Sequence, residues 1–413
     1  MKPFITNDAV VLGILIGILV FIFRTSKCNS PFWKKFYTFV PTLLLAYFIP
    51  SLLNSFGIIS GDDSKLYFVA SRYLLPTSLV LLTISIDLKE ILKLGPKALI
   101  MFLTGTFGII IGGPIAILIM SLISPETVGG AGSEAVWRGL TTIAGSWIGG
   151  GANQAAMKEV FEVNDNLFSA MITIDVIVAN IWMAFLLYGA GIHKKIDKWL
   201  KGDTSSIDRL VIKMENYHAR TRQIPELVDL FTILGAGFGI TSLSHYLSDL
   251  IAPWIQIHAP YLSRFSLTSG FFWIIVLSTT IAIFLSFTRV RNLESVGASN
   301  FGSLFLYILV ATIGMKMNIL AIFDHPGLFL VGIIWISIHA ILLIVAAKII
   351  KAPFFFLAVG SQANIGGAAS APIVASAFHP SLASVGVLLA VFGYAVGTYG
   401  AWLCGIIMQT VSP

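Results

Sequence analysis

Two glycine-rich stretches hold most of the polar side chains that could do chemistry in this chain. The first reads Gly-Ser-Trp-Ile-Gly-Gly-Gly-Ala-Asn-Gln over residues 145–154, and the second reads Gly-Ser-Gln-Ala-Asn-Ile-Gly-Gly-Ala-Ala-Ser over residues 360–370. Each glycine inside a helix costs about 1 kcal/mol relative to alanine, so both stretches predict a break in an apolar helix. A broken helix exposes free N–H groups that can hold an anion and carbonyl oxygens that can hold a cation.

We therefore expect solute ligands in both breaks. The candidate substrate-binding side chains there are Ser146, Asn153, Gln154, Ser361, Gln362, Asn364 and Ser370. The candidates for holding a coupling cation through the unwound backbone are Gly149, Gly150 and Gly366. The alternative is that the glycines only let helices pack closely, as small residues do in membranes. Three consecutive glycines beside Ser, Asn and Gln argue against that alternative.

Asp175 is the single residue with the strongest signal for a functional role, because it interrupts an otherwise apolar segment. An aspartate in mid-bilayer costs at least about 2.5 kcal/mol, so it should face a cavity or a partner. One hypothesis is a Na⁺ or H⁺ coupling site with Thr173 or Asn180 nearby. The alternative is a structural ion pair, or a hydrogen-bonded cap on one of the broken segments.

Four other polar residues have weaker signals. Arg72 could bind a substrate carboxylate with its bidentate fork, extend to the membrane surface, or pair with Asp175. Asp87 and Lys316 end two related apolar segments, and we expect both at the membrane interface. His339 is expected to be a hydrogen-bonded core residue, with a proton relay as the alternative.

The composition places these residues in a membrane. Of the 413 residues, 56% are apolar and only 11% are charged, whereas soluble domains carry about 25% charged residues. This excludes a cytosolic enzyme, a secreted disulfide scaffold and a nucleic-acid binder. The net charge of +6 therefore reflects membrane topology. Cys28 and Cys404 lie in different segments and imply no disulfide framework.

Ten segments are apolar enough to form spanning helices, which need about 20 residues. They are 8–24, 36–54, 67–86, 98–123, 166–190, 228–247, 270–287, 300–315, 326–349 and 382–410. The two glycine-rich stretches, 137–161 and 353–378, either cross the membrane or turn back.

The distribution of basic residues favours re-entrant hairpins. With hairpins, five loops fall on one side and hold 19 of the 26 lysines and arginines; with two crossings, the basic loops are split between the sides. The loops are 24–35, 87–97, 191–226, 288–296 and 348–351. By the positive-inside rule this side is cytoplasmic. Both termini are then predicted outside, although crossed broken helices stay open as an alternative.

The two halves also resemble each other. Gly145-Ser146 matches Gly360-Ser361 at an offset of 215, and residues 84–92 resemble residues 312–320 at an offset of 228. Five crossings and a hairpin in each half predict an inverted-topology repeat, which is typical of secondary transporters. The repeats are predicted at 1–190 and 227–413, joined by a basic cytoplasmic linker at 191–226.

Motifs for other chemistry are absent from the sequence. There is no H-E-x-x-H zinc motif and no Walker A loop, no nucleophile elbow, and no Cys/His cluster with metal-ligand spacing. We therefore expect no enzyme activity and no cofactor apart from a coupling ion, Na⁺ or H⁺.

The pattern S-W-I-G-G-G-A-N-Q-A-A-M at 146–157, the Asp175 segment and G-S-Q-A-N-I-G-G-A-A-S-A-P at 360–372 resemble the YjcL-like membrane family, a domain of unknown function. The resemblance implies a polytopic protein of the bacterial inner membrane and supplies no substrate. More distantly, the plan is similar to elevator-type sodium-coupled carriers of glutamate and citrate, and to the bile-acid symporters, which use crossed broken helices.

That similarity implies a transport domain at 67–190 and 300–410. It implies scaffold helices at 8–54 and 228–287, with a homodimer contact between scaffolds. The sequence lacks the Gly-Gly-His and acidic pattern of a close glutamate-carrier relative, so that substrate is not transferred.

The expected fold is thus an all-α polytopic membrane protein with lipid and a small-molecule solute as partners. The leading hypothesis is sodium- or proton-coupled import of a small organic anion, amino acid or short peptide. The alternatives are a cation/proton antiporter and a channel or sensor without a transport cycle.

Overall fold

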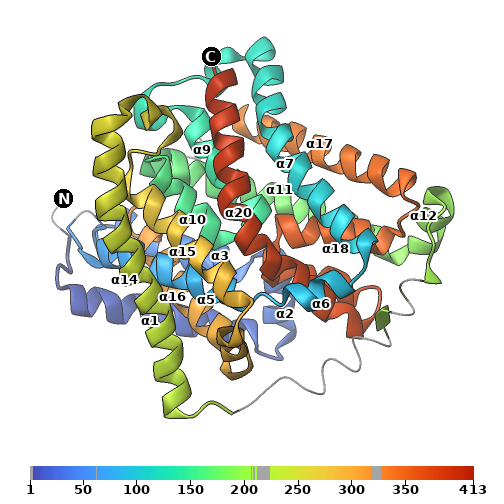
Figure 1. Ribbon diagram of the computed structural model, residues 1–413, viewed down its shortest axis with the longest axis horizontal. Helices are drawn as coiled ribbons and strands as arrows, with labels where there is room; N and C mark the ends of the chain where they lie inside the picture. Colours follow the sequence, from blue (N-terminus) through green and yellow to red (C-terminus); the bar gives the residue numbers. More distant parts are fainter. Residues whose placement is uncertain (1–2, 62, 206, 208–209, 212–223, 318–326) are drawn as a thin grey trace.

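The computed structural model describes the chain except for residues 1–2, 62, 206, 208–209, 212–223 and 318–326. Three parts of the sequence predictions therefore lie outside the described residues. They are the central part of the predicted linker, residues 318–320 of the matching segment in the second repeat, and residue 326 of one predicted span. All regular secondary structure in the described part is helical, and that part contains no strand, as predicted. In Figure 1, α14 runs along one edge of the molecule and α12 lies at the opposite edge.

The helices follow the order of the predicted segments. The first half contains α1 (Asp8–Ser26), α2 (Pro31–Phe39), α3 (Thr42–Ser55), α4 (Leu66–Val69), the π-helix η1 (Ala70–Leu74), α5 (Leu75–Ile84), α6 (Leu88–Lys93), α7 (Pro96–Ile123), α8 (Pro125–Val128), η2 (Gly132–Glu134), α9 (Val136–Gly149), α10 (Gly151–Val160) and α11 (Asp165–Gly191). After α12 (His193–Leu200), the second half contains α14 (Leu227–His258), η3 (Pro260–Phe265), α15 (Gly270–Ser286), η4 (Arg289–Val296), α16 (Ala298–Gly314), α17 (Gly327–Ile349), α18 (Phe354–Ile365), α19 (Gly367–Ser376), η6 (Pro380–Leu382) and α20 (Ala383–Val411).

The chain is a multi-pass membrane protein. Among the described residues, 7 helices are long and apolar enough to cross a membrane, or up to 9 if each of two sharply bent pairs forms one span. Each of the ten predicted segments contains a helix, but α16 has only 17 residues. The number of crossings therefore stays a prediction.

Both glycine-rich stretches turn back on themselves. At the base of the first, Arg138 Nη1 donates to the carbonyl of Phe161 at 2.5 Å, which joins the start of α9 to the end of α10. At the base of the second, the rings of Phe354 and Phe378 lie 6.0 Å apart. Hairpin 1 (α9 and α10) and hairpin 2 (α18 and α19) are therefore helical hairpins in this structure, rather than crossed broken helices.

Four of the five basic loops gather at one end of the molecule. Arg291 pairs with Asp87 at 2.9 Å, and Lys97 pairs with Asp203 at 3.3 Å. The backbone N–H of Asp203 also donates to the carbonyl of Lys351 at 3.2 Å. The base of hairpin 2 lies at this end, which we call the basic end.

The base of hairpin 1 lies at the other end, together with the C-terminus. Lys158 and Lys316 both pair with Asp165, at 2.8 and 3.2 Å. The hydroxyl of Ser412 donates to the carbonyl of Val128 at 3.3 Å. The two hairpins thus enter the molecule from opposite ends, and we call this one the terminal end. Which end faces the cytoplasm stays a prediction.

The helices pack as two groups. The flanking bundle consists of α1, α3, α4–α5, α14, α15 and α16, and the hairpin bundle consists of α7, α9–α11 and α17–α20. In each half, the helices of the flanking bundle precede those of the hairpin bundle along the chain. The two hairpins are thus held by the four long helices α7, α11, α17 and α20.

This division differs from the predicted transport domain of 67–190 and 300–410. The helices α5 and α16 pack chiefly against each other and against α3, α14 and α15. The hydroxyl of Ser78 on α5 donates to the carbonyl of Gly302 on α16 at 2.7 Å. Hydropathy identifies a spanning helix but does not indicate which neighbours its few polar side chains will meet.

Single-cysteine labelling tests the hairpins. In a Cys28→Ser background, a membrane-impermeant maleimide should label Ser133→Cys and Asn166→Cys from one side of the membrane. It should label Lys351→Cys and Ala377→Cys from the other, because each hairpin returns to the face from which it starts. Buried Cys404 in the parent protein serves as the unreactive control. Labelling of Ser133→Cys and Asn166→Cys from opposite sides would mean that hairpin 1 crosses the membrane.

Candidate functional site

The tips of the two hairpins meet inside the molecule. A Cβ added to Gly367 would lie 3.8 Å from the Cα of Gly150. Both residues have positive φ, +76° at Gly150 and +56° at Gly367, a conformation that glycine adopts without strain. The helices α10 and α19 begin at this junction, and neither has a side-chain cap. The uncapped N–H groups of two helix N-termini therefore lie together at this junction.

Asp175 lies beside hairpin 1 and binds both of its arms. Trp147 Nε1 on α9 donates to one carboxylate oxygen at 2.7 Å, and Gln154 Nε2 on α10 donates to the other at 2.8 Å. The hydroxyl of Ser146 also hydrogen-bonds the carboxylate. Asp175 is only 5% exposed. An N–H donor cannot ligate a cation, so in this conformation the carboxylate acts as the hydrogen-bonded cap that was the alternative expectation.

The predicted neighbours of Asp175 bind their own helix instead. The hydroxyl of Thr173 donates to the carbonyl of Ser169 at 3.2 Å, and the amide of Asn180 donates to the carbonyl of Val176 at 2.8 Å. Neither shows a bond to Asp175, so the described residues offer no cation cage built from these three side chains.

Asn153 attaches hairpin 1 to α20. Its amide nitrogen donates to the carbonyls of Gly149 and Tyr394, each at 3.1 Å. Its amide oxygen accepts from the hydroxyl of Thr398 at 2.7 Å. Gly149 packs so closely on Gly397 of α20 that no side chain fits between them. The amide of Asn153 and the carbonyl of Gly149 are thus both occupied by protein groups.

Asn364 attaches hairpin 2 to α7 with the same set of bonds. Its amide nitrogen donates to the carbonyls of Gly360 at 2.9 Å and Phe102 at 3.0 Å. Its amide oxygen accepts from Thr106 at 2.8 Å. In both hairpins, one asparagine binds the carbonyl four residues earlier, a carbonyl on a neighbouring helix, and the threonine one turn further along that helix. Sequence reasoning missed the two threonines, although each stands in a largely apolar helix.

Ser361 belongs to a third polar chain. Its hydroxyl oxygen lies 2.8 Å from His339 Nε2 and accepts from Trp182 Nε1 at 2.8 Å. His339 Nδ1 lies 3.0 Å from the carbonyl of Gly105, which can only accept. The imidazole therefore donates through Nδ1 and accepts from Ser361 through Nε2. His339 is fully satisfied as a neutral core histidine.

Gln362 is the candidate with an uncommitted polar atom. It is 1% exposed, and its Nε2 donates to Ser370 Oγ at 2.7 Å across hairpin 2. Its Oε1 is buried and has no partner among the described residues. If the amide is turned over, Ser370 can donate to Oε1, and the nitrogen is left without an acceptor. Gly366 makes room for this pair, since a Cβ there would collide with both side chains.

Three tyrosines that sequence reasoning did not select surround the junction. Tyr394 of α20 would contact a Cβ added to Gly150 at 3.6 Å. Tyr307 of α16 shares a hydrogen bond with Thr42 at 3.2 Å. The phenol of Tyr47 on α3 is buried and has no hydrogen-bond partner in the part of the chain that the structure describes; it lies within electrostatic range of Asp175 and Tyr307. Spanning-helix tyrosines gave no signal in the sequence because their neighbours at the junction come from distant segments.

Arg72 lies away from the junction, at the terminal end. Its Nη2 is 3.4 Å from Glu159 Oε2, and its guanidinium lies 4.4 Å from the ring centroid of Phe271. The expected alternative of a pair with Asp175 is therefore wrong. Asp87 and Lys316 lie at opposite ends of the molecule, each in an ion pair.

The comparisons with known proteins agree with a membrane protein. Residues 13–411 match the family model described as "Protein of unknown function (DUF819)". The chain is similar to the "Uncharacterized membrane protein YjcL" of Bacillus subtilis (strain 168), with 24% identity over 348 residues that cover 82% of each chain. The resemblance to a YjcL-like family is thereby confirmed.

The Asp175 cap can be tested by stability. Asp175→Asn should lower the free energy of unfolding by about 1–3 kcal/mol, because its NH₂ group would face one of two buried N–H donors and leave it unsatisfied. Thr173→Val, which loses only a bond to its own helix, should change the free energy by about 0.5 kcal/mol or less. Thermal unfolding in detergent measures both. Equal melting temperatures for the two variants would contradict the cap.

Proposed function

We propose that this chain, which belongs to the DUF819 family, is a secondary active transporter that binds its solute where the two hairpin tips meet. The observation that carries the proposal is the contact between Gly150 and Gly367, reached by hairpins from opposite ends of the molecule. Interrupted segments at matching positions of two halves are typical of transporter binding sites. No chemical conversion of the solute is proposed.

The junction offers ligands of the right kind for a small organic anion, an amino acid or a short peptide. The free N–H groups at the starts of α10 and α19 favour a negatively charged group such as a carboxylate. The amide of Gln362 and the hydroxyl of Ser370 add polar contacts at the tip of hairpin 2. The remaining candidate side chains are already bound within the protein, so selectivity would rest on these few groups.

The packing is compatible with an elevator movement. The hairpin bundle would carry the solute past the flanking bundle, which would form the fixed part and the contact of a homodimer. Where the first tip meets the flanking bundle, the contact is apolar, with Gly151 close to Leu43 and Leu306. Polar contacts that join the bundles elsewhere, such as the pair of Thr279 with Thr398 and the ion pair of Arg72 with Glu159, would have to break when the bundles slide.

The driving force would be a gradient of Na⁺ or H⁺ across a bacterial inner membrane. Protonation of Asp175 would remove one acceptor from Trp147 or Gln154 and loosen hairpin 1. A sodium ion would need oxygen ligands from another part of the junction, since N–H donors face both carboxylate oxygens.

Flux measurements with a matched pair of variants test the transport proposal. Purified protein in vesicles should take up members of a panel of organic anions, amino acids and dipeptides only when an ion gradient is present. Gln362→Leu should slow uptake about tenfold, the effect of losing one or two hydrogen bonds to a bound solute. It should change the melting temperature little, because the loss of the bond from Gln362 to Ser370 is offset by removal of a buried oxygen that has no partner among the described residues.

Gln256→Leu, the same change at an exposed position of α14, should leave uptake unchanged. Equal uptake by the two variants would contradict the proposal that the solute binds at the junction. Absence of gradient-dependent flux for the whole panel would contradict transport of such solutes. Sodium-driven proton movement without any solute would instead show a cation/proton antiporter.

Sodium coupling has its own test. The melting temperature of wild-type protein should be higher in Na⁺ than in choline at equal ionic strength, since an ion at 100 times its dissociation constant stabilises the folded state by about 2.7 kcal/mol. An equal melting temperature at every salt concentration would contradict sodium coupling. Uptake driven by a proton gradient alone would then identify H⁺ as the coupling ion.

A further inference from the structure

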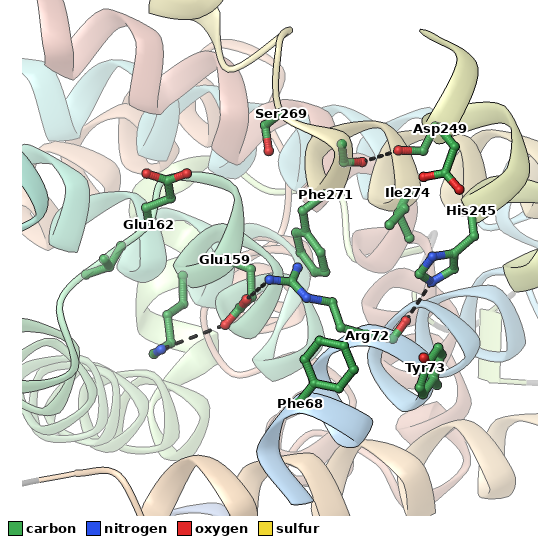
Figure 2. A pocket seen from close by; sticks show the side chains of 14 residues that line it. Phe68, Arg72, Tyr73, Glu159, Glu162, His245, Asp249, Ser269, Phe271 and Ile274 are labelled. Atoms are coloured by element: carbon green, nitrogen blue, oxygen red, sulfur yellow. Dashed lines mark hydrogen bonds and ion pairs between the residues drawn. The ribbon is translucent and has the colours of Figure 1, made fainter. Parts of the chain in front are cut away.

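A polar cavity that is separate from the hairpin junction lies at the terminal end, between the two bundles. Its volume is about 610 Å³, which is in the range of small-molecule sites. The walls come from η1, α14 and the start of α15 in the flanking bundle, and from the end of α10 in the hairpin bundle. Figure 2 shows the guanidinium of Arg72 reaching into this space beside Phe271, toward Glu159.

Arg72 has unused hydrogen-bonding capacity in this cavity. A guanidinium carries five N–H donors in a planar fork, but the structure gives this one a single ion-pair contact, with Glu159 at 3.4 Å. The side chain is 33% exposed, and its planar guanidinium lies over the ring of Phe271. The group that best fits the remaining donors is a carboxylate, which can accept from two of them at once.

The backbone that carries Arg72 is fixed from the other side. Arg72 lies in the π-helix η1, a feature that is frequent at functional sites. Its carbonyl lies 2.8 Å from His245 Nε2 on α14. This bond leaves the carbonyl of the widened turn satisfied and holds the guanidinium at the cavity wall.

Two carboxylates on the cavity wall are without a hydrogen-bond or ion-pair partner in the described part of the chain. Glu162 and Asp249 make no ion pair and no hydrogen bond to any other residue that the structure describes. They lie on opposite sides of Arg72 in Figure 2. Together they favour a positively charged group on the ligand. No cluster of three or more acidic, His or Cys side chains suited to a metal ion occurs in the described part of the chain, so the matching group is an organic ammonium.

We infer that this cavity binds a small zwitterion, a free amino acid or a short peptide. The ligand carboxylate binds the fork of Arg72, and its ammonium group binds Glu162 or Asp249. Phe68, Phe271 and Ile274 provide an apolar surface for the ligand side chain. This site is separate from the hairpin junction, and the inference does not require that the junction carries a solute.

Binding at this cavity would act on the contact between the bundles. Arg72 belongs to the flanking bundle and Glu159 to the hairpin bundle, and Glu159 is only 11% exposed. A ligand carboxylate competes with Glu159 for the guanidinium. Glu159 keeps the hydrogen bond that it accepts from Tyr67. Its buried carboxylate therefore still has a donor when Arg72 binds the ligand.

Calorimetry on the purified full-length protein tests the inference with three kinds of probe. These are glycine and glycylglycine as zwitterions, propionate as a carboxylate alone, and ethylamine as an ammonium alone. The zwitterions should bind at least about tenfold more tightly than either single-charge probe, because each ionic contact contributes about 1.4 kcal/mol or more.

Variants then assign the contacts. Arg72→Lys keeps the charge and loses the fork, so it should weaken zwitterion binding about tenfold, the loss of one charge-assisted hydrogen bond. The double variant Glu162→Gln, Asp249→Asn should weaken zwitterions to the level of propionate and leave propionate binding unchanged. The controls are Arg264→Lys and Asp63→Asn, two exposed positions outside the cavity, which should bind like wild type.

The inference is overturned if no zwitterion binds, or if the Arg72 and acidic variants bind like the controls. Gln362→Leu separates this site from the transport proposal. Normal zwitterion binding together with uptake slowed about tenfold in that variant would support two sites. Zwitterion binding without any gradient-driven flux of the solute panel would contradict the transport proposal and support the cavity as a binding site. Gradient-driven flux in a protein that binds no zwitterion would support transport and contradict the cavity as a binding site.

Discussion

The structure depends on satisfying polar groups where lipid leaves no water to do so. A helix that breaks inside the membrane exposes peptide groups, and each one left unsatisfied in hydrocarbon costs several kcal/mol. The two hairpins of this chain break at Gly150 and at Gly367, next to Asn, Gln and Ser side chains. Most of those side chains find a partner on one of the four helices around the hairpins, whereas Gln362 and Ser370 bind each other within hairpin 2. The arrangement of the hairpin bundle follows from that requirement.

The two asparagines show how the requirement is met. Asn153 and Asn364 each use both amide donors and the amide oxygen, and each fixes its hairpin to one long helix. Glycine makes this possible, because Gly149 and Gly397 let the backbones of α9 and α20 approach closely. The glycines near the tips therefore have two functions. Some allow the turn itself, and others allow the close packing that brings the asparagines to their acceptors.

The sequence allowed prediction of what a single segment needs, but not which partner it finds. The breaks were predictable because consecutive glycines are costly in a helix, and the cost of a buried carboxylate marked Asp175. The partners were not predictable, since Trp147, Thr106 and Thr398 are separated from the groups they bind by 28 to 258 residues. For the same reason the sequence left three possibilities open for Arg72. The hydropathy of α5 and α16 did not reveal that they join the flanking bundle.

The two hairpins differ in what they leave for a ligand. In hairpin 1, Asn153 and Gln154 are committed to α20 and to Asp175, so its polar side chains hold the hairpin in place. In hairpin 2, Gln362 spans the turn and keeps one amide atom that no described residue binds. An unsatisfied buried amide costs about 1–3 kcal/mol, and a bound solute would recover that cost by supplying the missing partner. If the junction binds a solute as proposed, hairpin 2 is the part whose stability would depend most on occupancy. A solute that pairs with Gln362 would stabilise the tip, and a solute that cannot pair would leave the cost in place. Selection at the junction would then follow from the same physical requirement that shapes the rest of the bundle.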